Sequence, residues 1–303
     1  MAGPALERSE GTVALASGRT RRDRRRRRLV VTLTYALLAL SGLTFSFPFL
    51  WTVSSSLKTA QETQLFPPQL FPDVPQWGNY VRVWTTQPVG RWIANSVIVV
   101  MLSVPGAALS GVLVAYSFAR FDYPGRGVLF MLLLSTLMLP FEVTLIPQYL
   151  FFYQLKWIDT FLPLTVPAWF GSSAFTVFLL RQFFLTIPKD FDDAARVDGA
   201  SSLRILWDII LPLSRPALAT IVILQFLSHW NDFLGPFVYL NSRDLFTMSI
   251  GLRYFQTVPE QLGEPKEHLL MVTTVIMTTP AILAFFAAQR YFIRGIVMTG
   301  LKL

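Results

Sequence analysis

The chain has 303 residues, of which 53% are apolar and 15% charged, with a mean hydropathy of +0.48 and a formal net charge of +8. Soluble domains carry about 25% charged residues, so this composition argues against an ordinary soluble enzyme and against a disordered chain. The absence of cysteine excludes a disulfide scaffold and a cysteine-ligated zinc or iron–sulfur centre.

The chain begins with a basic segment, residues 1–28, which ends in the run Arg24–Arg28. Its low apolar content predicts a disordered cytoplasmic tail. The apolar stretch that follows is longer than the h-region of a signal peptide, and no small-residue cleavage site follows it, so we expect a membrane anchor. A basic run beside a span is typical of a topology anchor near anionic lipid, and no nucleic acid is expected to bind it.

Six apolar blocks are each long enough to cross about 30 Å of hydrocarbon as a helix. They predict an all-α, polytopic membrane protein with six transmembrane helices. If the amino terminus is cytoplasmic, most of the 26 Lys and Arg residues fall in the tails and the inward connections. The positive-inside rule therefore places both termini in the cytoplasm. The predicted spans lie near residues 29–53, 92–117, 128–150, 162–181, 217–239 and 269–289.

Two of the blocks each contain one acid, Glu142 in the third and Asp232 in the fifth. An ionised side chain is costly in lipid, so both acids and the neighbouring Asn231 are candidates for the solute path. Other interpretations remain. Glu142 could face water at the outer end of its span, and Asp232 could pair with His229 or bond within its own turn.

No catalytic or nucleotide-binding motif occurs in the sequence. It lacks the Gly-x-x-x-x-Gly-Lys loop of ATPases, the Gly-x-Gly-x-x-Gly fingerprint, His-Glu-x-x-His and the nucleophile elbow. Two histidines are too few for a histidine metal cage. We therefore predict no catalytic residue, no metal site and no cofactor in this chain.

The most informative connection, residues 188–213, is predicted to face the cytoplasm. Asp190 and Asp193 resemble a capping box at the start of a short helix, and Gly199 is suited to end it in a left-handed conformation. Ser201 can then cap a second helix. A small-residue elbow of this kind lets another protein approach closely, although an amphipathic connector on the lipid surface is the alternative. The second helix has apolar residues at helical spacing, namely Leu203, Leu206, Trp207 and Ile210.

The same segment carries a specific spacing: Ala194-Ala195, then Gly199, Ile209 and Leu211-Pro212. This pattern resembles the EAA loop of binding-protein-dependent ABC importer permeases. Asp193 stands where the family has Glu, which keeps the charge on a shorter arm. Further motifs resemble the carbohydrate branch, and its MalG-like subunit in particular: Ser56-Leu57-Lys58, Ala115–Arg120, Met138-Leu139-Pro140, Trp230–Phe233 and Arg294–Lys302.

The resemblance implies a type I ABC importer permease fold, with a permease domain at residues 29–303 and a core transmembrane region at about 91–290. It implies the permease subunit of an ATP-driven sugar importer in a bacterial-type plasma (inner) membrane. The implied partners are a second homologous permease, two ATP-binding subunits that hold ATP and Mg²⁺ and hydrolyse the ATP, and an extracytoplasmic solute-binding protein. The implied ATPase-coupling residues are Asp193, Ala194, Ala195, Asp198, Gly199 and Ala200.

The outer segment Asn241–His268 is too long for a tight turn. By resemblance it reaches the docked binding protein, and a disordered surface loop is the alternative. Two other functions remain open. One is import of a non-sugar solute such as a polyol phosphate. The other is a self-contained secondary carrier, which would require inverted repeats and buried ion-coupling charges.

Overall fold

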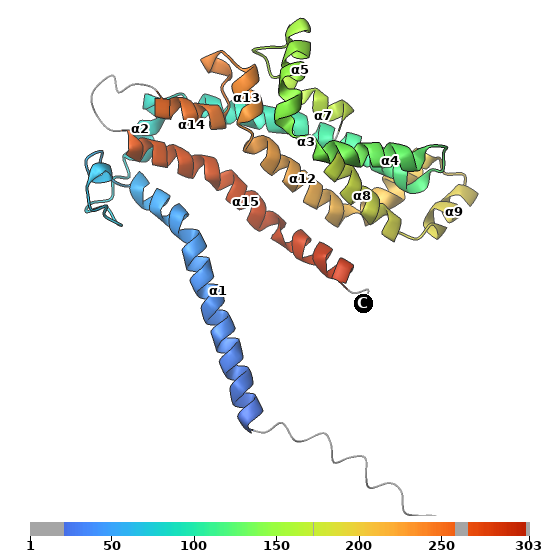
Figure 1. Ribbon diagram of the computed structural model, residues 1–303, viewed down its shortest axis with the longest axis horizontal. Helices are drawn as coiled ribbons and strands as arrows, with labels where there is room; N and C mark the ends of the chain where they lie inside the picture. The colour runs from blue at the N-terminus through green and yellow to red at the C-terminus, as the bar shows by residue number, and fades with distance from the viewer. Residues whose placement is uncertain (1–20, 172, 258–265, 301–303) are drawn as a thin grey trace, which may run out of the picture. The chain divides into compact units, whose positions relative to one another are not determined.

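A computed structural model of the chain describes residues 21–171, 173–257 and 266–300 (Figure 1). Every regular element in these ranges is helical. The chain divides into two compact units, residues up to Thr52 and residues from Val53 onward, and each is described by itself. The elements are α1 (Arg21–Ser56), η1 (Glu62–Gln64), α2 (Asn79–Thr86), α3 (Val89–Arg120), α4 (Arg126–Ser135), η2 (Thr136–Met138), α5 (Phe141–Gln154), α6 (Leu162–Thr165), α7 (Pro167–Phe170), α8 (Ala174–Thr186), α9 (Asp190–Val197), α10 (Ser202–Ile205), η3 (Leu206–Ile210), α11 (Leu211–Leu213), α12 (Arg215–Trp230), α13 (Leu234–Tyr239), η4 (Arg243–Leu245), α14 (Met248–Thr257) and α15 (Glu267–Gly300).

Helix α1 begins at Arg21, so residues 21–28 are helical. The expectation of a disordered tail as far as residue 28 is therefore wrong for these residues, and residues 1–20 lie outside the described part of the chain. Arginine is among the better helix formers, so the basic run extends the helix of the adjoining span backward.

The apolar part of α1 satisfies its own polar groups. Thr34, Thr44 and Thr52 each donate their hydroxyl to the carbonyl four residues earlier, at 2.9 Å. The large apolar side chains around them are exposed. In water this exposure would be unfavourable, but in lipid a helix must satisfy its polar groups internally and can expose apolar ones. These features are typical of a lipid-facing span.

Four of the six predicted spans are confirmed by apolar helical segments long enough to cross a membrane. The fourth predicted span contains α6, α7 and α8, and Ser173 caps α8 by accepting a hydrogen bond from the backbone N–H of Thr176 at 3.2 Å. Within the described residues the four segments are Arg26–Ser56, Val89–Arg120, Leu162–Thr186 and Glu267–Ala287.

The third predicted span, residues 128–150, is not one helix. The segments Arg126–Met138 and Phe141–Gln154 meet at an angle of 100°. Leu139 and Pro140 between them are extended, with ψ of 115° and 140°. A residue that precedes proline is sterically disfavoured in the α conformation, so the helix ends at this point.

The fifth predicted span, residues 217–239, is also interrupted, because α12 ends and α13 begins only at Leu234. Pro236 has no N–H to donate to the carbonyl of Asp232, so a continuous helix would leave that carbonyl without its usual partner. The side-chain hydroxyl of Ser249 donates to it instead, at 2.6 Å. The third predicted span is therefore a bent pair of helices, and the fifth is divided between α12 and α13. Within the described residues, the other bent pair long and apolar enough to cross a membrane is Ser202–Leu213 with Arg215–Trp230, which meet at 84°.

Helix α3 is the centre of the second unit and packs against α7, α8 and α12. In Figure 1 it extends from the neighbourhood of α2 and α14 toward that of α8 and α9. Buried apolar side chains gather at both of its ends. At one end they come from α2, α3, α14 and α15. At the other end they come from α3, α8, α12 and the short helices after α9, and include Leu180, Phe184, Ile205, Leu206, Ile210 and Ile221.

Candidate functional site

Helix α9 is a single short helix with acids in its first turn and Arg196 in its last, an arrangement that complements the helix dipole. The expected capping box is wrong. The residue at the cap is Lys189, which makes no side-chain capping bond, and Asp190 already belongs to the helix. The acids therefore stabilise α9 through its dipole.

The elbow after α9 is confirmed, and it is built on Gly199, whose φ is +80°. The N–H of Gly199 donates to the carbonyl of Arg196 at 3.0 Å, and the N–H of Ala200 donates to the carbonyl of Ala195 at 2.9 Å. These two bonds form a Schellman motif, which requires a left-handed residue at the position of Gly199. Glycine adopts that conformation without steric cost.

The two arms of the coupling loop are α9 before the elbow and α10, η3 and α11 after it. The second arm starts as predicted, because Ser201 accepts a hydrogen bond from the N–H of Arg204 at 3.3 Å. Its apolar face differs from the prediction. Leu203 and Trp207 are exposed, at 60% and 52%. The helix passes into a π-helical segment, η3, whose wider turn shifts the buried face relative to a 3.6-residue repeat. The residues that are buried are Ile205, Leu206 and Ile210.

Helix α9 and the helix that follows the elbow are both attached to the last two turns of α3. The guanidinium of Arg120 lies 3.3 Å from the carboxylate of Asp192 on α9. The same guanidinium donates to the carbonyl of Ile187 at 3.0 Å. One turn earlier, the hydroxyl of Tyr116 donates to the carbonyl of Ser202, the first residue of α10, at 3.1 Å. The side chains of Arg120 and Asp192 are only 3% and 5% exposed.

Asp193 was predicted as a coupling residue, whereas Asp192 and its partner Arg120 were not. The only local signal in the sequence was that Asp192 lies three residues before Ala195, so that the two share a helix face. In the structure, Ala195 contacts the core. The pairing with Arg120 joins distant parts of the chain, and helical periodicity carries no information on it. Asp193 itself is exposed.

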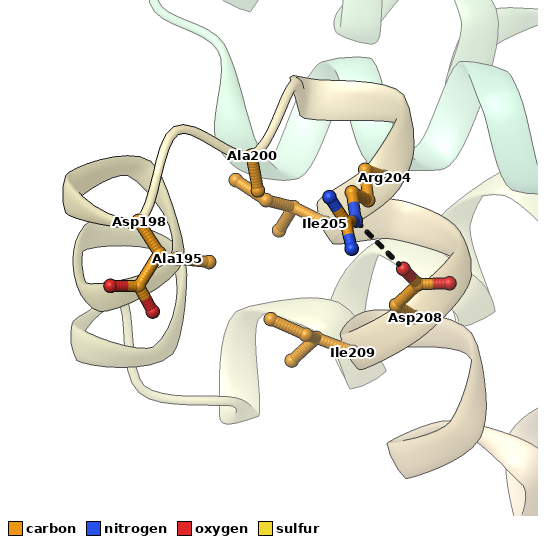
Figure 2. Close-up of a pocket in the computed structure, with 7 residues that line it drawn as sticks. All are labelled: Ala195, Asp198, Ala200, Arg204, Ile205, Asp208 and Ile209. Carbon is orange, nitrogen blue, oxygen red and sulfur yellow. Dashed lines mark hydrogen bonds and ion pairs between the residues drawn. The ribbon is translucent and has the colours of Figure 1, made fainter.

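A small pocket of about 220 Å³ lies between α9 and the second arm (Figure 2). Ala195 projects into it from α9, and the ion pair between Arg204 and Asp208, with 3.3 Å between Nε and Oδ2, lies on the opposite side. The pocket combines apolar surface with charged side chains at its rim. Its remaining lining residues are Asp198, Ala200, Ile205 and Ile209.

All six predicted coupling residues lie in α9 and its elbow. Four of them are exposed and two, Ala195 and Ala200, are half-buried against the core at the end of α3. The structure therefore brings together a small, mostly exposed surface supported by a rigid base. The exposed four are Asp193, Ala194, Asp198 and Gly199.

The three predicted solute-path residues lie in two places. Asn231 and Asp232 occupy the break between α12 and α13, where Asp232 Oδ1 accepts a hydrogen bond from the N–H of Gly235 at 3.2 Å. Glu142 is exposed in the first turn of α5. The far half of α5 packs on α13, where the rings of Tyr149 and Tyr239 stack at 6.5 Å. About 10 Å of helix separates Glu142 from that contact.

The outer segment is ordered in residues 241–257, so the disordered-loop alternative is wrong for them. It forms η4 and α14, which the start of α3 holds. The amide of Asn95 donates to the backbone carbonyls of Asp244 and Phe246 at 2.8 and 2.9 Å. The hydroxyl of Ser96 accepts from the N–H of Met248 at 2.8 Å. The remainder of the predicted loop, residues 258–265, lies outside the described part of the chain.

Asp159 joins the connection after α5 to the connection after α13. Its backbone is left-handed, with φ of +62°. Its carboxylate accepts hydrogen bonds from the N–H groups of Asn241 and Ser242, at 2.9 and 2.8 Å, and a short one from the Ser242 hydroxyl. These bonds hold the pKa of Asp159 below its ordinary value of 3.8, and the bond from the Ser242 hydroxyl has the largest effect.

Comparison with known proteins gives consistent matches. The family of binding-protein-dependent transport system inner membrane components matches residues 87–298. The arabinooligosaccharides transport system permease protein AraQ of Halalkalibacterium halodurans is 33% identical, over 90% of this chain and 96% of its own. The sn-glycerol-3-phosphate transport system permease protein UgpE of Yersinia enterocolitica is 32% identical, over 87% of this chain and 94% of its own.

Solved structures agree on the fold. A crystal structure of a bacterial ABC transporter involved in the import of the acidic polysaccharide alginate contains a similar chain. It is 25% identical, with a TM-score of 0.78, and the match covers 90% of this chain and 98% of that one. The bacterial alginate ABC transporter in complex with an alginate pentasaccharide-bound periplasmic protein gives a TM-score of 0.57 at 16% identity, which supports the fold alone.

Proposed function

Because this chain belongs to the binding-protein-dependent transport system inner membrane components, we propose that it forms half of the solute path of an importer whose solute is a sugar or a short oligosaccharide. It is a multi-pass permease subunit of an ABC importer. The similarity to an arabinooligosaccharide permease over nearly the whole chain is the observation that supports a carbohydrate solute.

The coupling loop, residues 188–213, is proposed to bind an ATP-binding subunit on the cytoplasmic side. Its support is geometric: two short helices meet at a glycine elbow, and no described atom lies within 4 Å of the position where a Cβ on Gly199 would stand. A partner could therefore approach the backbone closely. The proposed contact residues are Asp193, Ala194, Ala195, Asp198, Gly199 and Ala200.

The remaining partners follow from the same proposal. ATP and Mg²⁺ would be bound in two separate ATP-binding subunits, which agrees with the lack of a phosphate-binding loop in this sequence. A second homologous permease would enclose the other half of the path. An extracytoplasmic solute-binding protein would dock on the outer face, and both termini would lie in the cytoplasm.

The proposed solute path includes Glu142, Asn231 and Asp232. Asn231 is exposed and offers both a donor and an acceptor, so it can bond sugar hydroxyls. Asp232 is half-buried in the break between α12 and α13. A break in a span is a position where irregular backbone is tolerated because it lines a cavity or faces protein.

A second candidate solute is a polyol phosphate, which the similarity to the sn-glycerol-3-phosphate permease favours. Uptake by cells that express the full transporter distinguishes the two. We expect labelled oligosaccharide to be imported and to compete with its own unlabelled form, whereas sn-glycerol-3-phosphate should not compete. Import of sn-glycerol-3-phosphate without import of the oligosaccharide would identify a polyol phosphate as the solute.

Purification of the tagged chain from its native membrane tests the assembly. We expect an ATP-binding subunit with a phosphate-binding loop and a second permease to co-purify in fixed ratio. ATP hydrolysis by this complex should rise when the loaded binding protein is added. Solute transport by the chain alone, without ATP, would instead indicate a secondary carrier.

A further inference from the structure

The inner end of α3 holds the coupling loop by both of its arms. Arg120 contacts α9 through Asp192, and Tyr116 bonds the carbonyl of Ser202 at the start of α10. Residues four apart lie on one face of a helix, so both attachments come from the same face of α3, one turn apart. The elbow at Gly199 lies between the two attachment points.

The buried ion pair is a poor source of stability. Within the described part of the chain, neither carboxylate oxygen of Asp192 nor Nε of Arg120 has a hydrogen-bond partner. Burial of two charges is costly, and an incompletely hydrogen-bonded pair does not offset that cost well. The best-attested role of such pairs is to fix one arrangement of elements over others. The pair therefore points to positioning of α9.

The opposite end of α3 is attached as well. Asn95 and Ser96 bond the backbone of η4 and α14 on the outer side. A single continuous helix, Val89–Arg120, joins these contacts to the coupling loop. Packed helices transmit displacement as rigid bodies, so a movement of α9 would be carried along α3 to residues 244–248.

We propose that Tyr116 and Arg120 are positioning residues that fasten the coupling loop to α3, so that force applied to α9 moves the second span and the outer segment together. The proposal rests on the proposed function, since it assumes that an ATP-binding subunit pushes on α9. It assigns to Asp192 a role different from that of Asp193: Asp192 attaches the loop to its own chain, and Asp193 faces the partner.

The chain lacks cysteine, so a single introduced cysteine is the only labelling site in this subunit, and the partner subunits are used in cysteine-free form. Val197, at the end of α9, is 88% exposed and suits this purpose. In the assembled transporter, we expect Asp192→Asn to increase the mobility of a nitroxide at position 197. The matched control is Asp190→Asn, which makes the same change at an exposed acid of the same helix and should leave the spectrum unchanged.

Transport supplies the second readout. We expect Asp192→Asn to retain the ATP-binding subunit but to reduce solute transported per ATP hydrolysed by about tenfold, within the usual range of coupling between sites. Unchanged mobility together with an unchanged transport ratio would overturn the proposal. The proposed function fails separately, if the unaltered chain neither co-purifies with an ATP-binding subunit nor transports with ATP.

If Asp192→Asn does not fold, the milder variant Tyr116→Phe tests the same proposal. Tyr116→Phe removes one hydroxyl and leaves both charges, and a label at the exposed position 203 reports on α10. We expect greater label mobility and a roughly threefold lower transport ratio, the size expected for one neutral hydrogen bond. Tyr123→Phe is the control of equal chemistry. Equal effects of the two variants, or none, would overturn the proposal.

Discussion

Gly199 donates its N–H to the carbonyl of Arg196 at 3.0 Å while its own φ is +80°. A second glycine, Gly125, has φ of +81° at the cap of α4. No described atom lies within 4 Å of a Cβ built at either position. A side chain at either glycine therefore meets the same left-handed strain, about 1–2 kcal/mol, and no steric clash within the described chain.

Because Gly199 and Gly125 have the same backbone conformation, substitutions at the two positions give a controlled test of the elbow. We expect Gly199→Leu to leave membrane insertion intact and to reduce co-purification of the ATP-binding subunit by about tenfold, because the leucine occupies space that a partner needs. Gly125→Leu carries the same backbone strain and should retain the subunit. Equal losses from the two variants would show that strain alone causes the effect.

Gly106 on α3 lies beneath the indole of Trp169, and a Cβ there would stand 2.7 Å from the ring. The indole N–H donates to the carbonyl of Leu102 at 2.9 Å, which holds the ring in place. Gly106→Ala should therefore lower the free energy of unfolding by about 1–3 kcal/mol, the usual cost of overpacking. Thermal unfolding in detergent measures the change.

The control for that substitution is Gly127 on α4, where no described atom lies within 4 Å of the added Cβ. Gly127→Ala should be neutral or stabilising by about 0.5–1 kcal/mol, because alanine is the better helix former. In the Gly106→Ala background, Trp169→Ala should remove the clash. Strict additivity of the two changes would contradict the contact.

Asp159 should make the outer connections dependent on pH. Its folded-state pKa is lowered by the hydrogen bonds from Ser242 and Asn241. A group with a depressed pKa contributes stability that is present above its unfolded pKa, about 4, and is lost as pH falls through the folded value. The Tm difference between the unaltered chain and Asp159→Ala should therefore be largest near neutral pH and shrink below pH 4.

Ser242→Ala is a second variant for the same experiment. Removal of the hydroxyl donor raises the pKa of Asp159 toward its ordinary value, so the stability that the carboxylate contributes should be smaller at neutral pH and should be fully lost at a higher pH than in the unaltered chain. A pH-independent Tm difference for Asp159→Ala would show that the carboxylate charge is not involved.

Asn231 and Asp232 are adjacent but should respond differently. Asn231 is exposed and its amide donates to the carbonyl of Leu227 at 3.0 Å, so Asn231→Ala should lower Tm only slightly. It should raise the KM of uptake by roughly tenfold, as expected when one hydrogen bond to solute is lost. Asp232 accepts the N–H of Gly235, so Asp232→Ala should cost about 0.5–2 kcal/mol as a lost cap. A normal KM for Asn231→Ala would remove it from the solute path.

The helical class, four spans and the elbow could be predicted because their signals are local. The length of an apolar block indicates a membrane span. Gly199 followed by Ser201 indicates that one helix ends and another begins. The broken spans had local signals too, in Pro140 and Pro236. Each proline stood inside an otherwise apolar block, and block length favoured a continuous helix.

The attachment of the coupling loop could not be predicted in the same way. Arg120 and Asp192 are brought together by the packing of α3 against its neighbours, and a single sequence does not contain that pairing. The shift of the buried face after Ile205 arises from a π-helical segment, for which a 3.6-residue repeat has no allowance. The first failure comes from tertiary structure, and the second comes from a departure from regular α-helical geometry.

The central claim is that the coupling loop faces the cytoplasm and touches an ATP-binding subunit. A cysteine at position 197, the only one in the chain, tests it most directly. We expect a membrane-impermeant maleimide to label it in inside-out vesicles but not in intact cells, and a short cross-linker to join it to a subunit with a phosphate-binding loop. Labelling from outside intact cells would contradict the account.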